Sequence, residues 1–230
     1  MIFWDWLKQQ RRQINLGVAL GLAVALCLGL LVLRGRVFGR YGLTWLWWNL
    51  LLACLPACAA CAAYNLNAFA SRWRSWLVGV CGLFWLAFLP NAAYLITDVI
   101  HFRPVVGVPY WFDLIMFIAF AWTGTMMGIV SLLMMQTIVR QHGGRAVSWL
   151  FALCVLALNS FGVYLGRFQR WNSWDVITNP YSLCLDIAMR FLHPTAHLRT
   201  FAFTALFGAM FAVFYLTIIA LSDWRRVDEA

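Results

Sequence analysis

Polar side chains gather in two short stretches of this apolar chain, residues 88–101 and 164–175. Only 11% of all residues are charged. Ionisable groups near hydrocarbon cost free energy, so those that are kept there usually have a chemical or architectural role. We take both stretches, together with one acidic residue that begins a later apolar segment, as a candidate ligand-binding site. The candidate residues are Asn91, Asp98, His101, Asp113, Arg167, Arg170, Asn172 and Asp175.

The first stretch offers a carboxylate and an imidazole at helical spacing. Asp98 and His101 are three residues apart, so they share one face of a continuous helix. This spacing suits a carboxylate that orients an imidazole, or a pair of metal ligands; a hydrogen bond at a helix end is the alternative. Pro90 has no backbone donor and would leave the carbonyl of Leu86 unpaired, so Asn91 beside it either repairs a kink or contacts a ligand.

The second stretch is richer in charge. Arg167 or Arg170 could clamp a phosphate or carboxylate bidentately, or could form a structural ion pair with Asp98 or Asp113. The tryptophans of this stretch are typical of a membrane interface. An interfacial anchor does not need the additional variety of Arg, Asn and Asp side chains, so anion binding and structural ion pairing both stay open.

The composition places these stretches in a membrane protein. Hydrophobic residues make up 64% of the 230 residues, and the mean hydropathy is +0.79, which is far more apolar than a soluble domain. A helix needs about 20 mostly apolar residues to cross the hydrocarbon of a bilayer. We therefore predict an all-α, polytopic helix bundle in a single domain, residues 1–230. Its roughly six transmembrane helices are expected at about residues 14–33, 43–64, 76–96, 113–139, 147–165 and 201–221.

The loop after the fifth span is predicted to contain one more helix. Asn179 as the cap and Pro180 at the first position form a helix start signal. Polar residues then recur every four positions, and Asp186 and Arg190 can pair across one turn. We expect an interfacial amphipathic helix over about residues 180–192. Two histidines follow it, but the proline between them interrupts the continuous helix that a zinc-binding pair would need.

The two polar stretches are predicted to lie on one membrane face. Gly143-Gly144 predicts a tight turn, so the fourth and fifth spans form an antiparallel hairpin. The loop before this hairpin, 98–112, and the loop after it, 166–199, then emerge on the same side. On the side of the termini there are nine Lys and Arg residues, against eight on the other, or six when Arg167 and Arg170 are reserved for function. This count favours cytoplasmic termini.

Several classes of partner and cofactor are not expected. The net charge of +9 comes from basic residues scattered over both membrane sides, where they suit lipid headgroups and not a nucleic acid. Cys54-x3-Cys58-x2-Cys61 has the spacing of an iron–sulfur motif but lies inside a predicted span, so three ligands could not converge. We expect no cofactor, no metal site and no disulfide framework, with the intramembrane cysteines buried as small apolar side chains. The partners expected are the lipid bilayer and a lipid or small-anion ligand; no oligomeric state is indicated.

Motifs in both polar stretches carry a resemblance to one family. The run Arg170-Trp-Asn-Ser-Trp-Asp175 is the most specific of them. The others are 88–98 (Phe-Leu-Pro-Asn-Ala-Ala-Tyr-Leu-Ile-Thr-Asp), Trp111-Phe-Asp113, Phe120-Ala-Trp-Thr-Gly124, Tyr164-Leu-Gly-Arg-Phe and Asn179-Pro180. Over about residues 75–221 the chain resembles the bacterial multi-pass membrane family catalogued as domain of unknown function 1361. The resemblance implies a bacterial inner-membrane location, and it implies no particular activity or cofactor.

These observations favour a binding or transport module that recognises a lipid headgroup or small anion at one membrane face. One alternative is a membrane-embedded enzyme acting on a lipid-linked substrate, with Asp98 and His101 as acid/base or metal ligands. Another is a structural scaffold for membrane partners. The binding hypothesis requires an open polar cavity lined by Arg167 or Arg170, whereas the scaffold hypothesis predicts that the ionisable groups pair with one another around no cavity.

Overall fold

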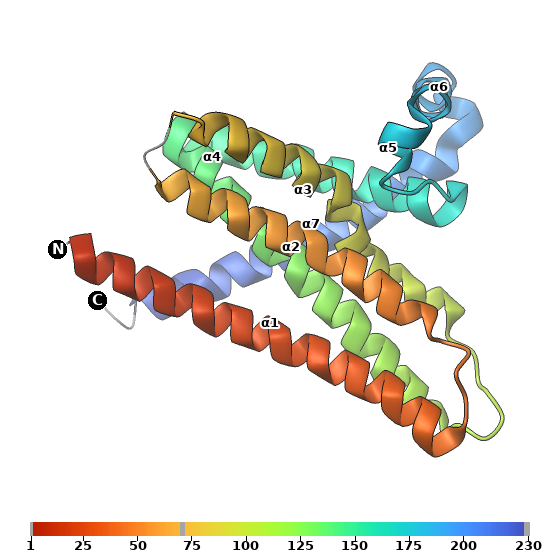
Figure 1. Cartoon of the computed structure of the whole chain (residues 1–230). Coiled ribbons are helices and arrows are strands. Elements are labelled where there is room, and N and C mark those ends of the chain that lie inside the picture. The colour runs from red at the N-terminus through yellow and green to blue at the C-terminus, as the bar shows by residue number, and fades with distance from the viewer. Residues whose placement is uncertain (1, 70–71, 228–230) are drawn as a thin grey trace.

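Long helices make up most of the computed structural model, which describes residues 2–69 and 72–227 (Figure 1). The described residues contain helices and no strand, so the all-α prediction is confirmed. In chain order the elements are α1 (Ile2–Phe38), α2 (Trp45–Ala68), α3 (Arg74–Thr97), the 3-10 helix η1 (Asp98–His101), α4 (Tyr110–Gln169), α5 (Asp175–Thr178), α6 (Pro180–Leu192), the 3-10 helix η2 (Pro194–His197) and α7 (Leu198–Val227).

Five of the described helices are long and apolar enough to cross a membrane, compared with about six predicted spans. The difference lies in α4, whose 60 residues contain a break at Gly144. The backbone there has φ 77° and ψ −175°, a conformation that glycine adopts without the strain other residues would suffer. Figure 1 shows the chain reversing at this point. The predicted hairpin therefore exists, with a first arm over residues 110–143 and a second arm over residues 145–169.

The hairpin places the two polar stretches at the same end of the molecule. In Figure 1 both termini and the Gly144 turn lie at the left, whereas the loops that follow α1, α3 and the second arm lie at the right. We call the right-hand side the loop end. The ion pair between Asp98, at the end of α3, and Arg167, at the end of the second arm, shows that the two stretches meet there.

Small residues let α3 approach α4 closely. A Cβ atom on Gly124 in the first arm would lie 2.4 Å from the carbonyl oxygen of Ala92. On Gly162 in the second arm it would lie 2.5 Å from Cγ of Pro90. No larger residue fits at either position without displacing α3. Both arms of α4 are thus held against the part of α3 that carries the first polar stretch.

A buried aromatic core joins α3, both arms of α4 and α7. Its largest members are Trp85, Phe207, Phe211 and Tyr215. The indole of Trp85 donates a 3.0 Å hydrogen bond to Ser131, so its one polar atom is satisfied within the core. α1 is peripheral by comparison, since only 6% of its most apolar stretch is buried against 39% for α2. Apolar packing alone therefore holds α1 only weakly against the bundle.

The seven cysteines are all free, as expected from their number and placement. Cys27 is fully buried, but Cys58 and Cys154 are exposed on the helix surface. The prediction of burial is wrong for these two because they lie on faces of α2 and of the second arm that no other helix covers.

α6 begins and ends where the start signal and polar spacing predicted. Asn179 occupies the position before it, although its side chain makes no capping hydrogen bond. Arg190 donates to Asp186 at 2.9 Å, which confirms the pairing across one turn. Arg190 also donates to Thr200 at 3.0 Å, and Trp171 donates to Asp186 at 2.9 Å. These bonds attach α6 both to α7 and to the loop that carries the second polar stretch.

Candidate functional site

Arg167 is the centre of the polar residues at the loop end. Its Nε donates to Oγ1 of Thr97 at 2.9 Å, and its Nη2 donates to a carboxylate oxygen of Asp98. The guanidinium carbon lies 3.8 Å above the centre of the Tyr94 ring, within the range of a cation–π interaction. One arginine from the second arm thus contacts three residues of the first polar stretch. The prediction that the two stretches come together is confirmed, and Asp98 is the acidic partner.

Asp98 joins a third element to this contact. Its side chain is fully buried, and its second carboxylate oxygen accepts a 2.9 Å hydrogen bond from Nδ2 of Asn49 in α2. A buried carboxylate requires such partners, because desolvation would otherwise favour its neutral form. Asp98 therefore connects α2, η1 and the second arm of α4.

His101 lies between Arg167 and an aromatic ring. Its Nε2 is 2.9 Å from Nη1 of Arg167, and its ring packs edge-on against Trp45 at a centroid distance of 5.4 Å. Because a guanidinium can only donate, Nε2 must be the acceptor, which places the imidazole proton on Nδ1. The predicted Asp98–His101 pair is therefore bridged by Arg167, and both residues contact the same guanidinium.

A cavity of about 520 Å³ opens beside these residues. We call it the arginine cavity. Arg103, from the loop after η1, is exposed at this cavity and has no hydrogen bond or ion pair with any described residue. Arg167 uses three of the five N–H donors of a guanidinium, so two have no partner in the described chain. The lining residues are Leu43, Trp45, Asn49, Tyr94, Asp98, His101, Arg103 and Arg167.

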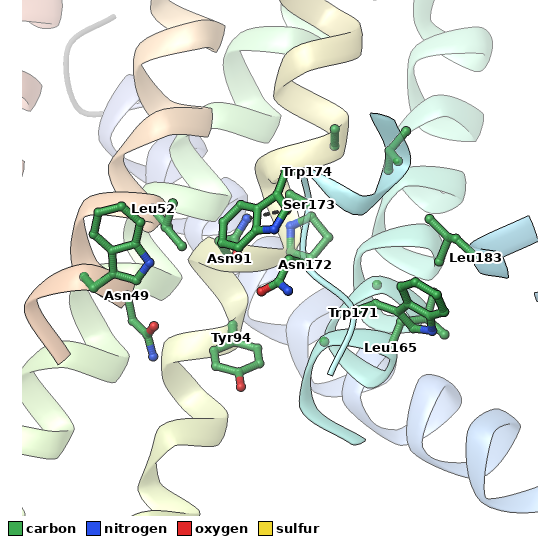
Figure 2. A pocket seen from close by; sticks show the side chains of 16 residues that line it. Asn49, Leu52, Asn91, Tyr94, Leu165, Trp171, Asn172, Ser173, Trp174 and Leu183 are labelled. Atoms are coloured by element: carbon green, nitrogen blue, oxygen red, sulfur yellow. Dashed lines mark hydrogen bonds between the residues drawn. The ribbon is translucent and has the colours of Figure 1, made fainter. Parts of the chain in front are cut away.

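A second cavity, of about 210 Å³, adjoins the first and shares Asn49 and Tyr94 with it. We call it the amide cavity. Figure 2 shows it between α2 and α3 on one side and the loop 170–174 on the other. Its lining residues are Trp48, Asn49, Leu52, Ala87, Pro90, Asn91, Tyr94, Gly162, Leu165, Gly166, Trp171, Asn172, Ser173, Trp174, Val176 and Leu183.

Asn91 bonds a backbone carbonyl of α3, that of Phe88 and not that of Leu86, while a ligand contact by Asn91 stays a prediction. Its Nδ2 donates to the carbonyl of Phe88 at 3.1 Å, so it supplies a partner to the α3 backbone beside Pro90. The same nitrogen donates to Oγ of Ser173 at 2.8 Å, the bond drawn in Figure 2. Asn91 therefore holds the second polar stretch against α3 while it lines the amide cavity.

The remaining candidates of the second stretch shape its loop. Arg170 has φ 62°, and the backbone N–H of Trp171 closes the end of α4 by donating to Leu165 at 3.2 Å. Asp175 accepts hydrogen bonds from the backbone N–H and from Nδ2 of Asn172, at 2.6 and 3.3 Å. Asn172 lines the amide cavity, whereas Arg170 and Asp175 line neither cavity. Asp175 stabilises the turn that directs Asn172 towards the cavity.

Asp113 lies at a different place from the other candidates. It accepts from Nε and Nη2 of Arg34 at 2.7 and 3.0 Å, a bidentate pair in which both residues are buried. The alternative pairing of Asp113 with Arg167 or Arg170 is wrong. α1 ends beside the start of α4, which places Arg34 next to Asp113. Arg34 also donates a 2.8 Å hydrogen bond from Nη1 to the carbonyl of Arg40.

Within residues 2–69 and 72–227, no three His, Cys, Asp or Glu side chains are arranged to hold a metal ion. His193 and His197 are not on one continuous helix, since α6 ends before them and η2 begins at Pro194. His197 lies instead with its Nδ1 3.5 Å from Nη1 of Arg190.

Sequence reasoning missed Asn49 and Arg34, and it did not select Arg103 or Tyr94. Asn49 is a single amide beside an apolar run of α2. Because burying an amide there costs free energy, its presence in this helix could have indicated a functional or structural partner. Arg34 resembled an ordinary headgroup anchor because two further arginines follow it. Its burial depends on a partner 79 residues away, which local spacing does not indicate.

Comparison with known proteins identifies the family. The family described as "Protein of unknown function (DUF1361)" matches residues 48–214. The match covers both cavities except for Leu43 and Trp45, and it starts within α2, earlier than the sequence motifs indicated. No curated protein and no solved structure matches the chain. Because the match spans well over half of the sequence, including all the candidate site residues, the chain belongs to the DUF1361 family.

Proposed function

We propose that this helical membrane protein binds an anionic group in the arginine cavity, either the phosphate of a lipid headgroup or a small free anion. The observation that carries the proposal is the position of Arg167 and Arg103 on one cavity. Arg167 has two unengaged donors, and Arg103 is exposed without a partner in the described chain. Guanidinium groups with free N–H donors are well suited to phosphate and carboxylate oxygens.

The balance of charge in this cavity supports an anion. Asp98 neutralises one of the two arginines, and no other acidic residue lines the cavity among the described residues. One positive charge therefore remains next to the membrane border, where headgroup phosphates are abundant. The scaffold alternative predicted ionisable groups that pair around no cavity, so the open space beside Arg167 favours binding over a purely structural role.

The proposed location is the bacterial inner membrane, with both termini in the cytoplasm. The count of Lys and Arg residues supports this orientation, and the two termini lie at one end of the bundle, opposite the loop end (Figure 1). The arginine cavity would then face the outer leaflet. A reporter enzyme that is active only in the cytoplasm, fused after residue 230, should be active; inactivity of an expressed fusion would reverse the orientation.

The test of anion binding uses the purified full chain and native mass spectrometry. We expect dihexanoyl phosphatidic acid to bind the wild type, and Arg103→Gln to weaken this binding about tenfold, since one arginine–phosphate contact is worth ~1.4 kcal/mol or more. Arg36→Gln is the matched control, because Arg36 is an exposed arginine near the loop end that lines neither cavity.

Inorganic phosphate provides the second arm of this test. Binding of both probes with equal sensitivity to Arg103 would indicate a free anion as the ligand, and binding of the lipid alone would indicate a headgroup. The proposal fails if neither probe binds, or if Arg36→Gln and Arg103→Gln weaken binding equally, because the effect would then come from general surface charge.

A further inference from the structure

The amide cavity contains neutral hydrogen-bonding groups and aromatic rings beside the charged arginine cavity. None of its 16 lining residues is charged. The two cavities adjoin and share Asn49 and Tyr94 as lining residues, so two linked groups of one ligand would lie close together in them. We propose that the amide cavity binds a neutral polyhydroxyl group joined to the anion, so that the ligand is a lipid phosphodiester carrying glycerol or a sugar. This inference rests on the proposed function.

The asparagines that line the cavity have carbonyl oxygens without a hydrogen-bond partner in the described chain. Asn49, Asn91 and Asn172 each use Nδ2 as a donor within the protein, to Asp98, to Phe88 and Ser173, and to Asp175 respectively. No described residue donates to the three Oδ1 atoms. Amide carbonyls in such a position require donors from a ligand or from water.

Donors are also available in the same space. Ser173 accepts from Asn91, and its own proton has no acceptor in the described chain. The hydroxyl of Tyr94 and the indole N–H of Trp174 likewise have no hydrogen-bond partner there, and Figure 2 shows both side chains at the cavity. A ligand hydroxyl both donates and accepts, so a polyol matches this mixture of carbonyls and donors, whereas a group that only accepts or only donates satisfies half of it.

An ammonium headgroup is the competing occupant, because carbonyls and aromatic rings also bind cations. The charges around the cavity oppose it. No carboxylate lines the amide cavity, and the guanidinium of Arg167 lies over Tyr94, at the junction of the two cavities. A cation here would lie near the guanidinium of Arg167 and would find no carboxylate among the described residues that line the amide cavity. A neutral group with apolar C–H faces avoids this cost and can stack on the Trp48 or Trp174 ring.

The size of the space agrees with a small polyol. A volume of about 210 Å³ corresponds to roughly seven water molecules at ~30 Å³ each. The cavity can therefore hold a glycerol group or a single sugar ring.

The test compares a lipid that carries the polyol with one that lacks it. By native mass spectrometry of the full chain, we expect dihexanoyl phosphatidylglycerol to bind about tenfold more tightly than dihexanoyl phosphatidic acid, because only the former fills the amide cavity with hydroxyl groups. Trp174→Ala should bring the ratio of the two affinities close to one. Asn172→Ala should reduce the preference in the same way, and Trp111→Ala is the matched control because Trp111 is an exposed tryptophan near the loop end that lines neither cavity.

A second pair of probes separates the two sources of the polyol: a glucosyl prenyl phosphate against the unglycosylated prenyl phosphate. The pair with the larger ratio identifies glycerol or sugar as the natural group. Equal affinities within both pairs, or tighter binding of dihexanoyl phosphatidylethanolamine than of phosphatidylglycerol, would overturn the inference. In those cases an Arg103-dependent affinity for phosphatidic acid would still support anion binding, whereas the loss of that dependence would remove the proposed function itself.

Discussion

Two buried arginine–aspartate pairs hold this protein together at its loop end, and they differ in what surrounds them. Arg34 and Asp113 form a bidentate pair in which both side chains are almost completely enclosed, 2% and 4% exposed. Asp98 is equally buried, but its partner Arg167 is 8% exposed and lines a cavity. The first pair attaches the peripheral helix α1 to α4, and the second connects α2, α3 and the second arm of α4.

The difference lies in the use of the donors. Arg34 directs Nε and Nη2 to one carboxylate and Nη1 to the carbonyl of Arg40, so each nitrogen faces protein. Arg167 also makes three hydrogen bonds, but it divides them among three side chains and lines the arginine cavity. The first arrangement has the properties of a structural attachment. The second borders open space, and it is the arrangement to which we assign the proposed anion binding.

Breaking the enclosed pair should have the largest effect on stability. Asp113→Asn leaves the Arg34 cation buried without a counter-charge, so we expect the free energy of unfolding to fall by about 3–5 kcal/mol. Denaturant unfolding of the purified protein in detergent, followed by circular dichroism, measures this change. Anion binding should persist in the fraction that stays folded, since neither residue of this pair lines a cavity.

Two further variants control this experiment. Arg34→Met combined with Asp113→Leu removes both charges and should recover most of the lost stability. Arg36→Met changes an exposed arginine two residues along the same helix and should alter the free energy of unfolding by less than about 0.5 kcal/mol. If the double variant is as unstable as Asp113→Asn, the pair contributes through its geometry and not through charge compensation.

Removing the acid from the cavity-lining pair should change binding more than folding. Asp98→Asn leaves Arg167 with Thr97, His101 and the ring of Tyr94. The cavity gains one net positive charge, so we expect the affinity for dihexanoyl phosphatidic acid to rise about tenfold. The free energy of unfolding should fall by less than in Asp113→Asn, about 1–3 kcal/mol. A loss of affinity in a folded Asp98→Asn protein would show that the pair shapes the cavity as a unit, and the contrast between the two pairs would disappear.

The sequence predicted the second pair better than the first. Gly143-Gly144 reverses the chain, and that reversal alone brings Asp98 and Arg167 to one end; the structure has this reversal at Gly144. Helix α6 was equally predictable, because Asn179, Pro180 and the four-residue polar spacing act through local backbone geometry.

The contacts that were not predicted depend on how separate helices are placed side by side. Arg34 and Asn49 lie on α1 and α2, whose positions against α3 and α4 are set by contacts between separate helices and not by a turn. Apolar surfaces are non-directional, so hydrophobic periodicity does not indicate which side chains meet across them. Both residues also stand alone among apolar or basic neighbours, and neither belongs to a recognisable motif.

The smallest effects are expected in the outer contacts of the two pairs. Asn49 donates to the buried carboxylate of Asp98, and Arg40 donates to the backbone carbonyl of Val106 at an exposed position. A hydrogen bond to a charged group is worth about 1.5–3 kcal/mol, so Asn49→Ala should lower the free energy of unfolding by about 1.5 kcal/mol. Arg40→Ala removes an exposed contact and should cost under about 0.5 kcal/mol. If Asn49→Ala and Arg40→Ala lower the free energy of unfolding equally, the hydrogen bond from Asn49 to Asp98 stabilises the fold no more than an exposed hydrogen bond does. The burial of Asp98 beside the cavity would then have to be stabilised by Arg167 alone.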